Sequence, residues 1–321
     1  MNRFIRLRLL AMILCLPFLL IFISGCGSSS QKKDEPPVYS PLQVLVPEAT
    51  GKETLGSSPM ILDVSNISQG YFIAQSDSSD LTCSLQIISP SGVLYSYFIA
   101  PGESATVTFT EGSGDYTITG YQQVQGDQYA ALYSETVTVQ LENDFLPFLY
   151  PNQYVNFTPD SKASQLALSL IDEDTVDVDA LQQIYDYVVS NLTYDYEKAD
   201  TVTTGYLPDV DETLKTGTGI CFDYAALTTA MLRSCDIPCK LQIGYAGDIK
   251  HAWIDVYIRS KGWVNQAVSF KGDTWTELPM ARLMSETFGT RHHEYEIDGT
   301  DKEAIQDYIG DESNYTVQFT R

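Results

Sequence analysis

The chain has 321 residues, of which 44% are hydrophobic and 19% are charged. This length accommodates two globular domains, and this composition excludes a disordered protein. The formal net charge is −23. A surface with this much negative charge repels nucleic acid and anionic lipid headgroups. We therefore do not expect a nucleic-acid partner.

The N-terminus has the features of a targeting segment. Three arginines precede an apolar run over residues 9–23, which is too short for a transmembrane helix. The run ends in ISGC, a lipobox in which Cys26 would accept a diacylglycerol before cleavage. An ordinary secretory signal with an incidental cysteine is the alternative. We expect residues 1–25 to be a lipoprotein signal peptide, with an extracytoplasmic mature chain anchored to the cell membrane at Cys26.

Cleavage before Cys26 would remove three arginines and no acid, so the net charge would fall from −23 to −26. Residues 26–59 are predicted to be the lipidated cysteine and a flexible tether, because the segment that follows Cys26 is small, polar and Pro-rich.

Residues 60–145 contain short segments rich in β-branched and aromatic residues, separated by turn sequences such as SPSG, APGES and EGSGD. This spacing predicts an all-β, sandwich-like domain. The segment contains no catalytic pattern, so we expect a binding or spacer role for it.

The periodicity becomes helical after residue 160. Apolar spacing predicts a short helix over residues 161–171 and a second one within 179–192. The acidic stretch before the second helix could hold calcium, but its order of ligands differs from an EF-hand loop and acids are also favoured at helix N-termini. Strands are expected in KLQIGYAG, HAWIDVYI, GWVNQAVSF and TWTEL, and one more helix and strand near the C-terminus.

Cys221 stands at the predicted start of a third helix, whose buried stripe would comprise Ala225, Thr228, Met231 and Leu232. Unpaired N–H groups and the helix dipole stabilise a thiolate at such a position, so we expect a lowered pKa and a nucleophilic role. A buried small residue is the alternative.

His251 begins a strand in which polar and aromatic residues alternate with apolar ones, so its side chain can face a cleft. Two further cysteines, Cys235 and Cys239, could form a local disulfide or remain free. No second Cys or His pair follows at a spacing suited to zinc, so we expect no metal and no organic cofactor.

The sequences GICFDYAALTTAMLRSCDIPCKLQIGY and KHAWIDVYIRSKGWV resemble the core of the transglutaminase-like superfamily. That family shows Gly-x-Cys, an Arg, Ile-Pro, Gly-Tyr, His-Ala-Trp and Gly-Trp-Val in this order, and all occur here. The resemblance covers about residues 155–280. It implies an α+β, papain-like fold for residues 146–321, in which Cys221 attacks a carbonyl and His251 acts as base and then as acid.

The Asp that orients the imidazole in this family does not carry over. Gapless alignment puts Ala267 at that position, and an alignment with SFKGDTW as an insertion puts Pro279 there. If the hairpin turns at residues 259–261, alternation places Asn265 and Ala267 on the face of His251, so Asn265 is the expected substitute. Asp273 and Glu277 are weaker candidates.

Two further residues near Cys221 are candidates for supporting roles. Tyr206 could donate a hydrogen bond to an oxyanion, and Asp223 is expected to be an acid of the first helical turn.

Two functions therefore stay open. One is a cell-surface thiol enzyme, a cysteine peptidase or a transglutaminase-type acyltransferase, acting on a protein or peptide substrate in the envelope or outside. The other is a catalytically degenerate domain that binds peptide or glycan, because a Ser–His–Asp enzyme loses ~10⁴-fold when its Asp is changed to Asn.

Overall fold

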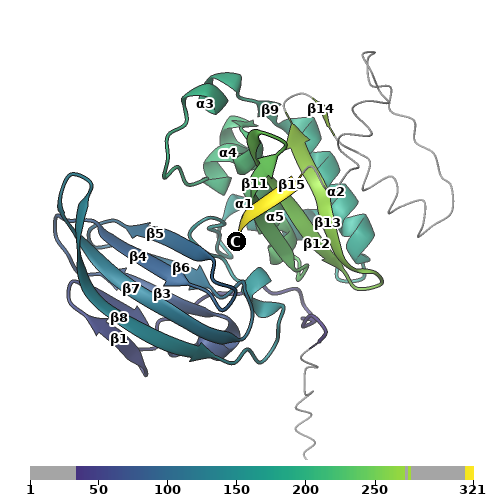
Figure 1. Cartoon of the computed structure of the whole chain (residues 1–321). Coiled ribbons are helices and arrows are strands. Elements are labelled where there is room, and N and C mark those ends of the chain that lie inside the picture. Colours follow the sequence, from purple (N-terminus) through teal and green to yellow (C-terminus); the bar gives the residue numbers. More distant parts are fainter. Residues whose placement is uncertain (1–33, 272–273, 276–314) are drawn as a thin grey trace, which may run out of the picture. The chain divides into compact units, whose positions relative to one another are not determined.

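The computed structural model describes residues 34–271, 274–275 and 315–321, and these belong to one compact unit, Gln31–Arg321 (Figure 1). The predicted signal peptide and Cys26 lie outside the described residues, as do Asp273, Glu277, Pro279 and the predicted C-terminal helix. Within the described residues, no helix is long and apolar enough to cross a membrane.

The N-terminal strands form two antiparallel four-stranded sheets. The first sheet has the order β1 (Thr54–Ser57), β2 (Met60–Asp63), β3 (Tyr71–Ser76) and β6 (Ser104–Thr108). The second has the order β5 (Leu94–Ile99), β4 (Cys83–Ile88), β7 (Gly114–Gln125) and β8 (Gln128–Val139). Alternate residues of both sheets bury one apolar cluster that includes Leu62, Phe72, Leu85 and Ile118. The β-rich N-terminal region predicted from turn spacing is therefore confirmed.

The segment before β2 is ordered over part of the range that was expected to be a flexible tether. β1 pairs with β2 along its whole length, and Val44 and Leu45 are buried. The Tyr39 amide donates a hydrogen bond to the Asp236 carboxylate (3.2 Å). The expectation of a tether through residue 59 is thus too long, because apolar residues in this segment find buried positions.

The C-terminal part combines helices with one mainly antiparallel sheet, as the α+β prediction requires. The helices are α1 (Lys162–Leu170), α2 (Asp177–Asn191), α3 (Tyr196–Thr201), α4 (Val210–Thr216) and α5 (Cys221–Ser234). The sheet has the order β14 (Thr274–Trp275), β13 (Gly262–Lys271), β12 (Ile249–Ile258), β11 (Cys239–Ala246) and β15 (Tyr315–Thr320). Short turns of 3-10 helix occur at η1 (Ile67–Gln69) and η2 (Leu146–Phe148).

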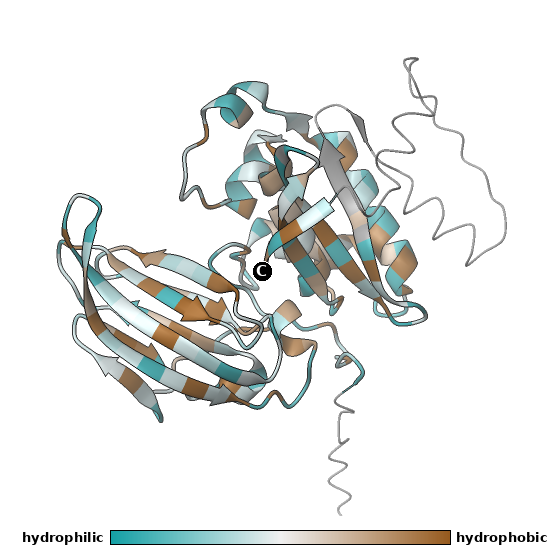
Figure 2. Ribbon diagram, in the orientation of Figure 1, coloured by the Kyte–Doolittle hydropathy of each residue, from teal (hydrophilic) through white to brown (hydrophobic). Residues whose placement is uncertain are grey.

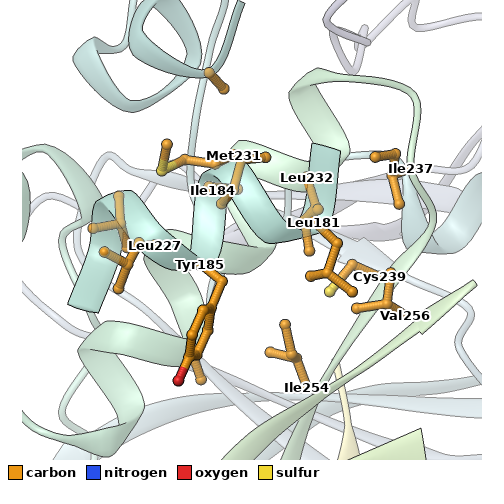
Figure 3. Packing of buried hydrophobic residues seen from close by; sticks show 14 of the residues in the cluster. Leu181, Ile184, Tyr185, Leu227, Met231, Leu232, Ile237, Cys239, Ile254 and Val256 are labelled. Atoms are coloured by element: carbon orange, nitrogen blue, oxygen red, sulfur yellow. The ribbon is translucent and has the colours of Figure 1, made fainter. Parts of the chain in front are cut away.

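Helix α5 is buried on every side. Its residues from Asp223 to Ser234 are all buried, whereas the sequence analysis expected a single buried stripe. The reason is that the sheet covers one side of α5 through Ile254 and Val256, and α2 covers another through Leu181 and Ile184 (Figure 3). The ribbon of α5 is accordingly brown and pale over most of its length, in contrast to the teal stretches of α3 and α4 (Figure 2).

Arg233 ties the C-terminal end of α5 to three other segments. Its guanidinium is fully buried and donates hydrogen bonds to the carbonyls of Cys239 (2.8 and 3.0 Å), Tyr150 (2.7 Å) and Arg321 (2.8 Å). Burial lowers the pKa of Arg233 to about 10, so the side chain stays charged at neutral pH. This arginine therefore satisfies carbonyls that would otherwise be buried without a donor.

We expect Arg233→Met to destabilise the protein by about 3 kcal/mol, because it leaves three buried carbonyls without their donor while keeping most of the side-chain volume. The measurement is the urea midpoint of unfolding. Arg259→Met is the control, since the guanidinium of Arg259 is partly exposed and its loss should cost about 1 kcal/mol or less. Equal losses in the two variants would contradict the role given to Arg233.

Candidate active site

Two short paired strands lie directly before Cys221 in the structure. β9 (Thr193–Tyr194) and β10 (Thr218–Gly219) pair in parallel, with Tyr194 beside Gly219. The backbone N–H of Ile220 then donates to the Asp223 carboxylate (2.8 Å), which caps the start of α5. A Cβ on Gly219 would lie 2.7 Å from the Asp223 Cβ, so only glycine fits this approach to the helix.

The thiol of Cys221 is free and half-buried against strand β12. Its sulfur accepts hydrogen bonds from the backbone N–H groups of Ala252 and Phe222. Ala252 directly precedes Trp253, which pairs with Ser269 of β13. The Ala252 amide is the peptide group that follows His251. The structure thus brings Cys221 within one peptide unit of the His251 backbone.

The ring of His251 lies on the face of β12 that does not contact α5. Ala252, Ile254, Val256 and Ile258 belong to the core around α5, as the predicted alternation requires. The His251 side chain is 6% exposed, and its ring lies 6.2 Å from that of Trp253 and 6.4 Å from that of Tyr315. The Cys221 sulfur bonds to the N–H of Ala252, the residue that directly follows His251, so the thiol and the imidazole belong to neighbouring positions of α5 and β12.

A bulge changes the position of the third residue. Val256 pairs with Val264, but Ile254 pairs with Val268, so β13 holds two more residues than β12 between these pairs. As a result Ser269, not Ala267, stands opposite Trp253. Ala267 is buried in the core around α5, which corrects its expected placement on the face of His251.

Asn265 does not lie next to His251, where the sequence analysis expected it. It is exposed and directly follows Val264, the partner of Val256, whereas His251 is buried near the other end of β12. A separation of four to five residues along a strand corresponds to about 13 Å or more. An asparagine side chain cannot span that distance, so the structure does not bring Asn265 to the imidazole.

Tyr194 is a site residue that the sequence analysis missed. Its hydroxyl donates a hydrogen bond to the Cys221 sulfur and accepts one from the backbone N–H of Cys221. Burial, together with the neighbouring thiol, raises the pKa of Tyr194 to about 12, so the hydroxyl stays protonated. The tyrosine-rich sequence before α3 gave no means of selecting this residue, because the pairing of β9 with β10 decides which tyrosine meets the thiol.

Tyr206 and Asp223 belong to a partly buried polar cluster at the start of α5. The Tyr206 hydroxyl donates to Asp223, and Lys198 Nζ contacts both the Tyr206 hydroxyl and the carboxylate at 2.7 Å. Tyr206 is thus engaged with the helix cap, which argues against the oxyanion role considered for it. Lys198 was also missed, although it is the single basic residue in the stretch 193–214.

Hydrogen bonds within this cluster set the protonation states of Lys198 and Tyr206. Burial alone would lower the pKa of Lys198, but its hydrogen bonds to Asp223 and Tyr206 outweigh burial and raise that pKa. Burial and the bond to Asp223 raise the pKa of Tyr206 to about 12. Lys198 is therefore a cation and Tyr206 a neutral donor at physiological pH, as the cap requires.

The pKa of Cys221 differs in direction from the sequence expectation. Burial of the thiol raises it, and hydrogen bonds from Ala252, Phe222 and Tyr194 offset only part of that increase. The nearby Asp223 carboxylate adds to it. The resting nucleophile is therefore a neutral thiol, not the thiolate predicted from the helix N-terminus.

The other cysteines of the described chain form no disulfide. Cys83, Cys235 and Cys239 are free and buried, and burial raises the pKa of both Cys235 and Cys239 to about 12. The acidic stretch before α2 lines a surface hollow through Asp172, Asp174 and Asp179. Among the residues that the structure describes, no group of three or more His, Cys, Asp or Glu side chains is arranged to hold a metal ion.

A free cysteine at the start of a buried helix, set against a strand that carries a histidine, defines a thiol-type α+β domain. Residues 164–266 match the family model described as the transglutaminase-like superfamily, and this segment contains both Cys221 and His251. The chain therefore contains a transglutaminase-like domain, as the resemblance of its motifs indicated.

Solved structures with similarity to the chain include three proteins. A candidate cysteine protease from Cytophaga hutchinsonii is 18% identical over 70% of this chain and 81% of its own, with a TM-score of 0.34. A candidate protease from Parabacteroides distasonis is 14% identical over 58% of this chain and 38% of its own, with a TM-score of 0.28. Red sea bream transglutaminase is 14% identical over 60% of this chain and 47% of its own, with a TM-score of 0.23. No curated protein matches the chain.

We expect alkylation of Cys221 by iodoacetamide to increase with pH, with a midpoint above the ordinary thiol value of 9.0. The thiolate is the reacting form, so a raised pKa delays its formation to higher pH. The measurement is the rate of mass increase at each cysteine by mass spectrometry. Cys221 should react before the fully buried Cys83, Cys235 and Cys239. A midpoint near pH 7 would show that the thiol is activated at rest.

Two tyrosine variants provide the control for this titration. Tyr194→Phe removes a hydrogen bond that lowers the Cys221 pKa, so the midpoint should rise by up to about one pH unit. Tyr196→Phe removes an exposed tyrosine hydroxyl two residues away and should leave the midpoint unchanged. Identical shifts in both variants would contradict the contact between Tyr194 and the sulfur.

Proposed function

We propose that the chain is a lipid-anchored thiol enzyme of the cell surface that cleaves or transfers the acyl group of peptide or glutamine amide bonds. Cys221 is the nucleophile and His251 is the base. The observation that carries this proposal is the contact between the free Cys221 sulfur and the peptide that follows His251, inside a transglutaminase-like domain.

The raised thiol pKa supports a mechanism in which the proton leaves during attack. His251 accepts the thiol proton as the sulfur forms a bond to the substrate carbonyl carbon. The imidazolium then gives this proton to the departing amine or ammonia, which leaves an acyl-enzyme. Water or a second amine attacks the thioester, loses its proton to His251 and releases the acid or the new amide, and the sulfur regains its proton.

The backbone N–H of Cys221 would stabilise the oxyanion of this reaction. In the free protein that N–H is bonded to the Tyr194 hydroxyl. A substrate carbonyl oxygen would take the place of this hydroxyl, and Tyr194 would move aside as substrate enters.

Packing would orient His251 in place of the missing Asp. The imidazole is buried beside the rings of Trp253 and Tyr315, which limits its rotation. Because Asn265 lies too far along the strand, we do not assign it the orienting role that the sequence analysis gave it.

A catalytically degenerate domain that binds peptide or glycan is the second candidate. Two observations favour it: the gapless alignment puts Ala267 where the family has its acid, and the Cys221 thiol is neutral at rest. A neutral thiol reacts slowly with amides.

The activity test uses glutamine-containing and ordinary peptides, with and without an added amine, and measures ammonia release, amine incorporation and hydrolysis. We expect Cys221→Ala to abolish turnover and His251→Gln to reduce it by ~10²–10⁴-fold, the usual contribution of a general base. Asn265→Ala is the matched control and should retain turnover, because this residue is exposed and remote. A folded wild-type protein that turns over no substrate in the panel would favour the degenerate domain.

The anchor rests on the lipobox at Cys26 and needs its own test. Cells that express the full chain are grown with a labelled fatty acid, and the label on the protein is measured. Cys26→Ala should lose the label and the membrane association, whereas Cys15→Ala, a cysteine within the same apolar run, should keep both. Label that persists in Cys26→Ala would contradict the proposed site.

A further inference from the structure

The outward face of the sheet β5-β4-β7-β8 carries no charge over three successive cross-strand rows. The rows are Phe98-Ser84-Tyr121-Ala131, Ser96-Gln86-Thr119-Ser134 and Leu94-Ile88-Thr117-Thr136. The residues that alternate with them on β4 and β5, such as Leu85 and Tyr97, point into the sandwich core. These rows therefore lack charged side chains on a chain whose formal net charge is −23.

Two aromatic rings meet at one end of this neutral face, and Tyr121 stands in the same cross-strand row as one of them, Phe98. We define the neutral face by Gln86, Ser96, Phe98, Tyr121, Gln123 and Tyr129. The rings of Phe98 and Tyr129 lie 6.2 Å apart, although β4 and β7 separate their strands in the sheet. The long β7–β8 hairpin must therefore bend over the face, which its register shifts at Gly120/Tyr121 and Gln123/Gln125 permit. Figure 1 shows this hairpin extending past the ends of the neighbouring strands.

The rings form a platform that stays open to solvent. Phe98 is 50% exposed, so its contact with Tyr129 does not bury it. Ser84, which stands between Phe98 and Tyr121 in the same row, is only 6% exposed, so the flanking side chains cover it. The Gln123 amide donates to the Gly126 carbonyl (2.8 Å), which fixes one polar side chain beside the rings.

The chemistry of the neutral face fits a sugar chain. A pyranose ring offers an apolar C–H surface that stacks on aromatic rings, and its hydroxyl groups both donate and accept hydrogen bonds. The Gln86 amide and the Ser96 and Tyr121 hydroxyls likewise donate and accept without the desolvation cost of a charge. A charged polymer would find no counter-charge in these rows, and an extended peptide would pair with a sheet edge rather than lie on a face.

We propose that the neutral face of the sandwich binds an uncharged polysaccharide chain, with the sugar rings stacked on Phe98, Tyr121 and Tyr129. This site is independent of the thiol chemistry at Cys221. It gives the β-sandwich a binding role through which the anchored chain would hold a glycan-bearing partner.

The test is affinity electrophoresis of the full chain, in mild detergent, through gels that contain a soluble neutral polysaccharide: hydroxyethyl cellulose, xyloglucan, mannan or starch. Retardation by at least one of them is expected. Tyr121→Ala and Tyr129→Ala should each weaken binding by about tenfold or more, and Tyr121→Phe should keep most of it, because the ring remains. Tyr196→Ala, an exposed tyrosine outside the sandwich, is the control and should bind as the wild type does.

Several outcomes would overturn this assignment. The first is that none of the four neutral polysaccharides retards migration, and the second is that anionic alginate retards it more strongly. The third is that the protein binds a peptide library and no polysaccharide. The fourth is that Tyr121→Ala and Tyr129→Ala, with wild-type unfolding midpoints, are retarded as much as the wild type. Cys221→Ala should bind the polysaccharide normally, so failure of the thiol chemistry and failure of this site give separate readouts.

Discussion

Helix α5 is enclosed by the sheet on one side and by helices on the others, and this enclosure positions both of its ends. At the C-terminal end, the buried Arg233 guanidinium joins three backbone carbonyls from distant segments. At the N-terminal end, Asp223 caps the helix and holds Lys198 and Tyr206. At this N-terminal end the Cys221 sulfur contacts the backbone N–H of Ala252 on β12.

The same enclosure explains the chemistry of the thiol. A cysteine at an exposed helix N-terminus would be stabilised as a thiolate by the helix dipole. Here burial and the Asp223 cap outweigh the hydrogen bonds that reach the sulfur, so the pKa rises. A protonated thiol resists oxidation, which suits a protein proposed to work outside the cytoplasm, and it makes catalysis depend on proton transfer to His251 at the moment of attack.

In the proposed function, the sandwich would bind a polysaccharide and the transglutaminase-like domain would carry out the thiol chemistry. The three rows of this face contain rings, hydroxyls and an amide but no carboxylate, amine or guanidinium, so the face offers binding without charged groups. The titratable groups with perturbed pKa values around Cys221 lie instead in the C-terminal part, namely Tyr194, Lys198 and Tyr206. The proposed anchor would keep both parts near the cell surface.

The sequence by itself determined the local structure and the family. Turn spacing and the alternation of apolar residues were enough to predict the β-rich region and strands β11 to β13. The sequence motifs around Cys221 and His251 identified the transglutaminase-like domain. These signals depend only on residues that are close together in the chain. Tertiary structure decided the rest. The two-residue bulge in β13 moved Ala267 into the core, and the β9–β10 pair brought Tyr194 to the thiol. Burial then reversed the direction of the Cys221 pKa shift, since desolvation depends on contacts between segments far apart in the sequence.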